Sequence, residues 1–348
     1  MSLSKTLLGL ISIITFSIMM VSFAVKQKDD GEVTFIIPKG WPKPAYDFKK
    51  NPVTQEGFKL GRKLFFDPVL SRDSSISCNS CHTQFSAFTH VDHSVSHGIN
   101  GLKGTRNSST IFNMAWNTSF MWDGAVKHLD MQALAPMSNP DEMDESIKHV
   151  VSKLQQSKRY PMLFFKAFGD SIITGEHTLK AMSQFMLTLV SYNAKYDSVL
   201  RREASFTQQE NNGYRLFRAN CASCHREPLF TNNQFENNGL PVDTSLHDNG
   251  RMRITQDSAN YLQFKVPTLR NIQVSYPYMH DGRFVRLQQV LNHYTNGIVR
   301  SKTLSKQLQQ RIVLSNCEQE DIIAFLATLT DKNYLNNVQF AYPKNILH

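Results

Sequence analysis

The sequence has few of the features that mark several large protein classes. It has no long stretch in which apolar and polar residues alternate, so a β-sheet protein is not expected and a mainly α-helical fold is favoured. The formal net charge of +9 is spread along the chain rather than gathered in one basic block, which argues against a nucleic-acid-binding protein. Low-complexity segments are absent, and only five of the 348 residues are cysteine. The positions of these five cysteines are therefore the most informative feature of the sequence for predicting a functional site.

Four of the cysteines lie in two copies of one pentapeptide pattern. The copies are Cys78-Asn79-Ser80-Cys81-His82 and Cys221-Ala222-Ser223-Cys224-His225. In this spacing both thiols can reach the vinyl groups of a porphyrin, while the adjacent imidazole binds the iron. The sequence thus predicts two covalently bound haem c groups, with His82 and His225 as iron ligands.

Paired cysteines also occur in other kinds of site. The pairs of a zinc site usually lie closer together in the sequence, and they need no histidine fused to the second cysteine. A thioredoxin-like redox pair requires a βαβ setting, which the chain lacks. Structural disulfides stay open for an exported protein. The fifth cysteine, Cys317, lies in an amphipathic stretch and is expected to be a buried thiol.

The N-terminus predicts export. Lys5 precedes an apolar run over residues 6–23, and residues 22–24 have the small-x-small form of a signal-peptidase site. The run is also nearly long enough to span a membrane. Residues 1–24 are therefore interpreted as a signal peptide or an uncleaved N-terminal anchor, and the protein is expected in the periplasm, either soluble or tethered.

The rest of the chain contains two similar halves, which indicates an internal duplication. The pattern Gly-x-x-Leu-Phe begins at Gly61 and again at Gly213, each time on a predicted helix ahead of a pentapeptide. The first of these helices is expected over residues 54–66, and the second is expected to begin with a capping box at Thr207. Downstream, Arg-Asn recurs at 106 and 270, and Met-x-Asp-Gly recurs at 121–124 and 279–282. We expect two cytochrome c-like haem domains with long loops, over residues 25–203 and 204–348.

The two halves differ at one informative position. Fourteen residues after Trp122 lies Pro136, whereas fourteen residues after His280 lies Tyr294. Proline has no side chain that can bind iron, but a tyrosine oxygen can be a haem ligand. The second haem would then be closed by Tyr294, leaving the first open to a small substrate. A buried, hydrogen-bonded tyrosine is the alternative, and His293 and Met279 are rival ligands.

Further candidates surround the first haem. Glu142 follows Pro136 closely, and a carboxylate in an apolar pocket has a raised pKa that suits proton transfer to and from peroxide. Taken alone, a glutamate such as Glu142 is more often a solvated loop acid. Gln132 is a polar neighbour, and Trp122 could be a core aromatic or an electron relay. His97 lies in a Ser/Gly-rich loop and could cap the first iron, although a lone histidine is more often a surface residue.

Taken together, these residues resemble the bacterial dihaem cytochrome c peroxidase family, which includes the MauG-type enzymes. The resemblance covers nearly the whole mature chain and is carried by both pentapeptides and by the segments 104–108, 120–124, 139–143, 267–271 and 277–282. It implies that Glu142 is the catalytic acid/base with Gln132 beside it, and that Trp122 lies between the haems. It also implies a calcium ion between the haem domains. The matching oxygen ligands are the side chain of Asn107 and the backbone carbonyls of Ser275 and Pro277.

The resemblance points to both branches of the family. His97 matches the mobile-loop histidine that caps the haem of resting peroxidases. Tyr294 departs from the usual peroxidase pattern, which has methionine there, and resembles the MauG branch. The chain therefore combines one feature of each branch.

Three functions are considered in consequence. The first is a periplasmic peroxidase that reduces hydrogen peroxide with electrons from a small cytochrome c or cupredoxin. The second is a MauG-like enzyme that uses peroxide and high-valent haem to oxidise residues of a protein or peptide partner. The third is a non-enzymatic electron carrier or sensor with both irons six-coordinate. A homodimer is compatible with all three.

Overall fold

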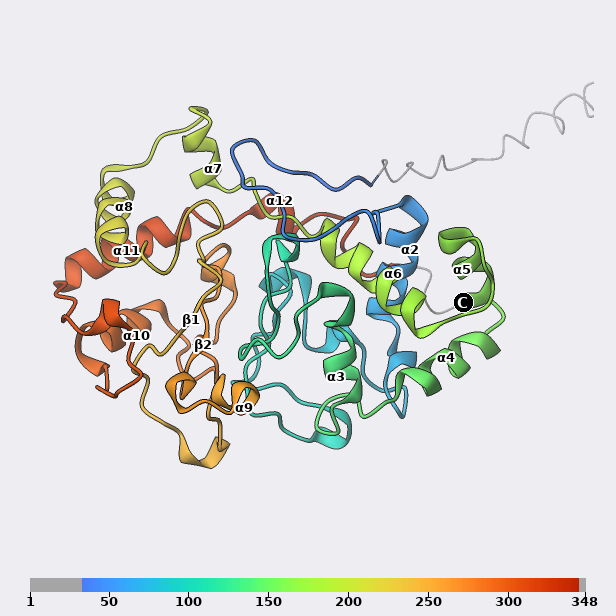
Figure 1. Ribbon diagram of the computed structural model, residues 1–348. Helices are drawn as coiled ribbons and strands as arrows, with labels where there is room; N and C mark the ends of the chain where they lie inside the picture. Colours follow the sequence, from blue (N-terminus) through green and yellow to red (C-terminus); the bar gives the residue numbers. More distant parts are fainter. Residues whose placement is uncertain (1–32, 344–348) are drawn as a thin grey trace, which may run out of the picture. The chain divides into compact units, whose positions relative to one another are not determined.

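The structure, a computed structural model, describes residues 33–343 and is mainly α-helical (Figure 1). Residues 1–24, interpreted above as a signal peptide or anchor, lie outside this range. The helices are α2 (Gln55–Phe66), α3 (Leu134–Ser138), α4 (Ile147–Gln156), α5 (Tyr160–Phe168), α6 (Gly175–Thr188), α7 (Lys195–Leu200), α8 (Gln208–Asn220), α9 (Met252–Thr255), α10 (Leu287–Asn292), α11 (Asn316–Ala327) and α12 (Lys332–Leu335). Two short strands, β1 (Phe235–Glu236) and β2 (Phe264–Lys265), pair antiparallel. No helix within residues 33–343 is long and apolar enough to cross a bilayer. The predicted fold class is confirmed.

The two helices predicted ahead of the pentapeptides begin where their caps predict. The hydroxyl of Thr54 accepts a hydrogen bond of 3.0 Å from the backbone N–H of Gly57 at the start of α2. At α8, Thr207 and Glu210 form the expected capping box, each side chain accepting from the other residue's N–H. These bonds satisfy amide groups that a helix start otherwise leaves unpaired.

The repeated glycine has the same structural role in both halves. Helix α2 packs against α6, and α8 packs against α11 (Figure 1). A Cβ atom on Gly61 would lie 1.9 Å from the carbonyl oxygen of Ala181, and one on Gly213 would lie 1.8 Å from that of Asp321. Each glycine therefore allows the helix before a pentapeptide to approach a partner helix closely.

Gly213→Ala is accordingly expected to lower the free energy of unfolding by about 1–3 kcal/mol or more, because the added methyl group meets backbone that cannot rotate away. Denaturant unfolding of the purified protein measures this change. Asn211→Ala, at an exposed position of the same helix, is the control and should change stability by no more than about 0.5 kcal/mol. If the two variants were equally stable, α8 and α11 could move apart to accommodate the methyl group without a loss of folding free energy.

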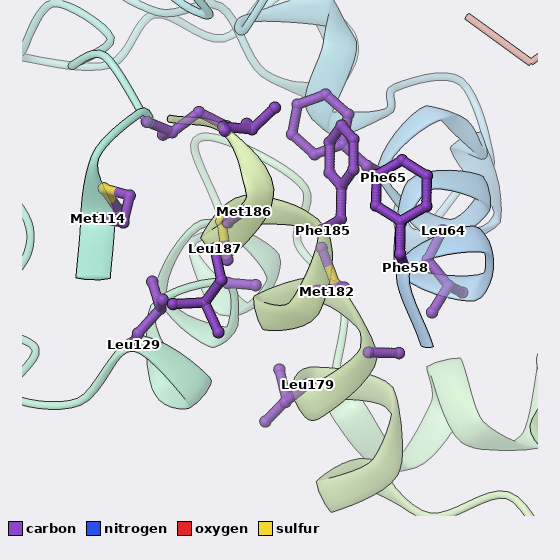
Figure 2. Packing of buried hydrophobic residues seen from close by; sticks show 14 of the residues in the cluster. Phe58, Leu64, Phe65, Met114, Leu129, Leu179, Met182, Phe185, Met186 and Leu187 are labelled. Carbon is purple, nitrogen blue, oxygen red and sulfur yellow. The ribbon is translucent and has the colours of Figure 1, made fainter. Parts of the chain in front are cut away.

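The first hydrophobic core gathers around α2 and α6 (Figure 2). The ring centroid of Phe185 lies 5.1 Å from that of Phe65 and 5.8 Å from that of Phe58. Leu179 and Met182 on the same helix are also buried, so α6 supplies one side of this core.

A second core gathers around α8 and α11, with Phe217, Phe230 and Phe325 fully buried. Some residues on each side of the expected domain boundary, between residues 203 and 204, pack in the core of the other half. Tyr196 packs in the second core, whereas Tyr334 and Phe340 return to the first.

The duplication is visible in matching turns. Phe120 bridges to Val126 in the first half, and Tyr278 bridges to Phe284 in the second. Within these turns the equivalent residues share left-handed backbone, with φ of +69° at Met121 and +75° at Met279, and of +73° at Gly124 and +68° at Gly282. The two halves thus present the residues after each turn in the same local geometry.

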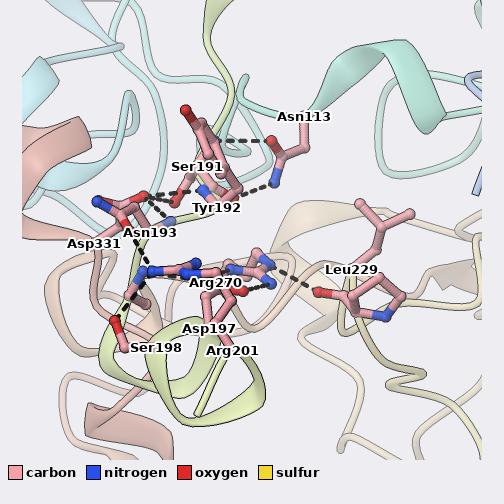
Figure 3. A network of polar contacts seen from close by, with 12 residues as sticks. Asn113, Ser191, Tyr192, Asn193, Asp197, Ser198, Arg201, Leu229, Arg270 and Asp331 are labelled. Atoms are coloured by element: carbon pink, nitrogen blue, oxygen red, sulfur yellow. Dashed lines mark hydrogen bonds and ion pairs between the residues drawn. The ribbon is translucent and has the colours of Figure 1, made fainter. Parts of the chain in front are cut away.

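A buried polar network joins the segment after α6 to the C-terminal half (Figure 3). The carboxylate of Asp331 accepts hydrogen bonds from the hydroxyl of Ser191 and from the backbone N–H groups of Tyr192 and Asn193. Nearby, the fully buried Arg270 donates two hydrogen bonds, of 2.9 and 2.7 Å, to Asp197. Arg270 and Asp197 form a hydrogen-bonded ion pair, and the Asp331 carboxylate is satisfied by hydrogen bonds, so the burial of these charges is tolerated and the junction is geometrically specific.

The expectation for Cys317 was wrong, because this thiol is exposed. Cys317 lies in the first turn of α11, and the buried face of that helix is formed further along by Ile322, Phe325 and Leu326.

Candidate functional site

The two pentapeptide histidines are held in the same way. The Nδ1 atom of His82 lies 2.7 Å from the carbonyl oxygen of Phe88. The Nδ1 atom of His225 lies 3.1 Å from that of Phe230 and 3.2 Å from that of Pro267. Since a carbonyl can only accept, Nδ1 carries the proton, and Nε2 is the nitrogen left to bind metal. Burial lowers the pKa of both histidines to about 4, so each ring is a neutral ligand.

The second pentapeptide borders a cavity of about 280 Å³. Cys221, Cys224 and His225 line it together with Tyr294 and Met279. Much of the remaining wall is apolar, formed by Phe217, Leu269, Ile272, Leu287, Val290, Leu291, Ile312, Leu314, Ile322 and Leu326. Two thiols and a neutral imidazole at an apolar cavity are the donor set that a covalently attached haem requires. The residues present therefore fit a haem c.

The thiols are available for attachment. All four pentapeptide cysteines are free, so they form no disulfide. Burial raises the pKa of Cys78 and of Cys221 to about 12, which keeps both as thiols. The structure thus offers no support for the disulfide interpretation.

The geometry distinguishes the candidate ligands of the second haem. Tyr294 lies on a π-helical turn (His293–Gly297) after α10 and lines the cavity, where burial raises its pKa to about 12. His293 is buried with its Nε2 atom 3.0 Å from the carbonyl oxygen of Asn238, and it does not line the cavity. The Sδ atom of Met279 accepts a hydrogen bond of 3.4 Å from the Asn238 side chain. This arrangement favours Tyr294, leaves Met279 as its rival and disfavours His293.

Glu142 lies beside the first pentapeptide. Burial raises the pKa of Cys78 and of Cys81, and the negative charge of Glu142 adds to the rise at both thiols. Burial raises the pKa of Glu142 itself, and the Asn139 side chain, donating at 2.9 Å to its Oε1 atom, opposes the shift. These surroundings are not those of a solvated loop acid.

The loop that carries His97 packs against the backbone next to Glu142. The backbone N–H of Ile99 donates to the carbonyl of Glu142 at 2.8 Å. A Cβ atom on Gly98 would lie 2.0 Å from the carbonyl oxygen of Asp141, so only glycine fits this approach. The thiol of Cys81 lies 3.8 Å from the carbonyl oxygen of His97. The structure therefore brings His97, Glu142 and the first pentapeptide together.

Trp122 and Gln132 occupy a different place from Glu142. Both line the large cavity, and neither is hydrogen-bonded to Glu142 within residues 33–343. The indole N–H of Trp122 donates at 2.9 Å to the carbonyl of Asn107, and its own carbonyl accepts at 2.7 Å from the N–H of Lys265. Trp122 thus contacts the second half directly.

The three candidate calcium ligands, Asn107, Ser275 and Pro277, all lie on the wall of this cavity. The Asn107 amide nitrogen donates at 3.0 Å to the carbonyl of Ser94, which leaves its Oδ1 atom as a free acceptor. Within the described residues, the carbonyls of Ser275 and Pro277 accept no hydrogen bond. An oxygen-only set of this kind suits a hard cation.

Comparison with known proteins identifies the family. A family model described as di-haem cytochrome c peroxidase matches residues 55–205, and one described as cytochrome c matches residues 210–330. The methylamine utilization protein MauG of Methylorubrum extorquens is 36% identical over 299 residues, covering 84% of this chain and 82% of that protein. The chain belongs to the di-haem cytochrome c peroxidase and MauG family. As a family member it is an oxidoreductase with two c-type haems in two cytochrome c-type domains.

Both branches of the family are among its relatives. The cytochrome c551 peroxidase of Nitrosomonas europaea is 34% identical over 284 residues, covering 80% of this chain and 81% of that protein. Among solved structures, a MauG-like protein associated with microbial copper homeostasis superposes with a TM-score of 0.79 at 30% identity. It covers 89% of this chain and 99% of that one. Overall similarity therefore does not separate the peroxidase branch from the MauG branch, and individual residues must distinguish them.

Two residues of this family member were missed from the sequence. His90 is only 5% exposed, and neither of its ring nitrogens has a partner within residues 33–343. Arg106 is a partly buried link between the halves, donating to Asp123 at 2.7 Å and to Asp248 through two hydrogen bonds. The repeated Arg-Asn pair was a signal for Arg106, but nothing local marks His90 as buried.

Proposed function

We propose that the chain is a periplasmic peroxidase that reduces hydrogen peroxide to water with electrons from a small cytochrome c or cupredoxin. Residues 25–203 would form the peroxidatic domain, and residues 204–348 the electron-transfer domain. The observation that carries the proposal is the partly buried Glu142 carboxylate beside the first pentapeptide, with its raised pKa. Pro136 also supports the proposal, because it occupies the position in the first half that corresponds to Tyr294 in the second half and has no side chain that can bind iron.

Proton transfer is the contribution of the first domain's side chains. The first haem supplies an iron site at which the O–O bond of peroxide can be cleaved. Glu142 would take a proton from one oxygen of peroxide and deliver it to the other oxygen, which leaves as water. The Asn139 side chain orients the Glu142 carboxylate for both steps. Overall, one peroxide, two electrons and two protons give two waters.

Electrons would reach the first site through the second domain. Trp122 supports this route, since it lines the cavity beside the second pentapeptide and its carbonyl is bonded to β2. Tyr294 would close the second haem, so that peroxide reacts only at the first. His97 would cap the first iron until the loop is displaced. The oxygens of Asn107, Ser275 and Pro277 would hold a structural calcium ion between the domains.

Steady-state consumption of peroxide with reduced cytochrome c tests the proposal. We expect turnover of roughly 1–10³ s⁻¹, before or after partial reduction of the enzyme. A variant with Cys78→Ser and Cys81→Ser, which lacks the first attachment site, is the control and should be inactive. Absence of turnover in the wild type at every redox level would exclude a peroxidase. A Soret shift with cyanide after half-reduction separates an enzyme from a carrier whose irons are both six-coordinate.

A second candidate function is supported by Tyr294. In a MauG-like enzyme, peroxide would be consumed to oxidise residues of a protein or peptide partner, and no external electron donor would be needed. Peroxide-dependent mass changes in a partner, measured without reduced cytochrome c, would favour this function.

A further inference from the structure

A lysine lines the cavity beside the second pentapeptide. Lys265 lies on β2, and within residues 33–343 it is the one lysine or arginine on the wall of this cavity. Its neighbours on the wall include Cys221, Cys224 and His225. The cavity that fits the second haem therefore has a single fixed cation.

The Lys265 ammonium has no anionic partner. None of the carboxylates within residues 33–343 forms an ion pair with it, and burial alone lowers the pKa of Lys265 to about 7. Lys265 is partly buried, and an ammonium at an apolar wall without a counter-charge is energetically costly, so such charges are normally paired. The group that occupies the cavity is the natural source of the missing anion.

The nearest rival within the chain is Glu236, which lines the same cavity on β1. In the pairing of the two strands, Lys265 lies opposite Phe235, and Glu236 lies opposite Phe264. Because cross-strand partners share a face, Phe235 and Lys265 lie on one face of the pair and Glu236 and Phe264 on the other, and no ion pair between Glu236 and Lys265 is formed within residues 33–343. The register thus explains why these two residues do not pair.

We propose that the Lys265 ammonium forms an ion pair with a propionate carboxylate of the second haem and holds this edge of the haem beside Trp122. The backbone N–H of Lys265 already donates to the Trp122 carbonyl at 2.7 Å, so one residue joins the haem anchor to the indole of the other half. The inference rests on the second c-type haem, and it deepens the electron-transfer role proposed above for residues 204–348.

The ion pair has an electrostatic consequence. A fixed positive charge near the haem stabilises the reduced iron, which has one positive charge fewer than the oxidised iron. Removing the charge should therefore favour the oxidised form of the second haem and leave the first haem nearly unaffected.

Lys265→Met tests this in the holoprotein by spectroelectrochemical titration without peroxide, with haem content checked by pyridine haemochrome. We expect the ratio of reduced to oxidised second haem at a fixed applied potential to fall at least tenfold, which is 59 mV for a one-electron couple. Lys265→Arg should keep the ratio within threefold of wild type. Lys265→Gln provides the same measurement if the methionine variant loses haem.

Two controls complete the test. Lys302→Met, at an exposed position in the same half, should leave both haems unchanged. The effect of Lys265→Met should persist in a Glu236→Gln background, because a lysine that pairs with Glu236 would lose its effect there. An unchanged second haem in Lys265→Met, an equal shift of both haems or disappearance of the effect in the double variant would overturn the inference. Because no peroxide is used, the result is independent of whether the chain is a peroxidase.

Discussion

Glu142→Gln is expected to lower kcat for peroxide reduction by about 10²–10⁴-fold, the usual contribution of a positioned acid/base. Glutamine keeps the shape of the side chain and its contact with Asn139, but it cannot accept and return a proton. The haem sites lose no ligand, so the content of both haems should be unchanged. Stopped-flow and steady-state assays with reduced cytochrome c measure the effect.

The pH dependence of the wild type gives an independent readout. Glu142 must be ionised to accept the peroxide proton, and burial raises its pKa above the ordinary value. The rate should therefore fall as the pH drops through this raised pKa, at a higher pH than for an ordinary glutamate. The acidic limb should disappear in Glu142→Gln.

Asp141→Asn is the matched control for Glu142. Asp141 is exposed, and its negative charge contributes to the raised pKa of Glu142. Activity should be retained in this variant, while the acidic limb moves to lower pH. If Glu142→Gln kept more than about a third of wild-type kcat, a role for Glu142 in proton transfer would be untenable.

Tyr294→Met is expected to raise the reduction potential of the second haem by on the order of 0.1 V or more, within the roughly 0.8 V range that axial ligands span. A hard oxygen ligand favours oxidised iron, whereas a thioether favours reduced iron. Spectroelectrochemical titration measures the change for each haem. In the same variant, a MauG-like reaction should be abolished, whereas peroxidase turnover with an external donor should be retained.

Two further variants decide between the rival ligands. Tyr278→Phe removes a hydroxyl that lines the same cavity but donates to the carbonyl of Ile272, so the potential should not move. Met279→Leu should also have little effect if Tyr294 binds the iron. A large change in Met279→Leu together with none in Tyr294→Phe would assign the ligand to Met279.

Local patterns were sufficient to predict much of this molecule. Capping at Thr54 and Thr207 depends on neighbouring residues only, and so does the spacing of the two pentapeptides. The fourteen-residue comparison placed Tyr294 at the cavity because the turns at Met121 and Met279 share one backbone geometry. Because the chain is duplicated, positions in the second half could be predicted by comparison with the equivalent positions in the first half.

Contacts between distant segments could not be read in this way. His90 was not singled out from the sequence, since its burial depends on packing between distant segments. Arg106 and Lys265 gain their importance from residues more than a hundred positions away. Cys317 was misjudged because an amphipathic pattern does not fix which face its first turn presents.

The bonds of Asp331 bear on how the chain is assembled in the cell. Residues 191–193 donate three hydrogen bonds to this carboxylate, and the first core takes Tyr334 and Phe340 from the same late segment. The earlier half cannot bury these groups until nearly the entire polypeptide has been synthesised. We therefore expect a chain truncated before Asp331 to lose part of the first core as well as the end of the second half.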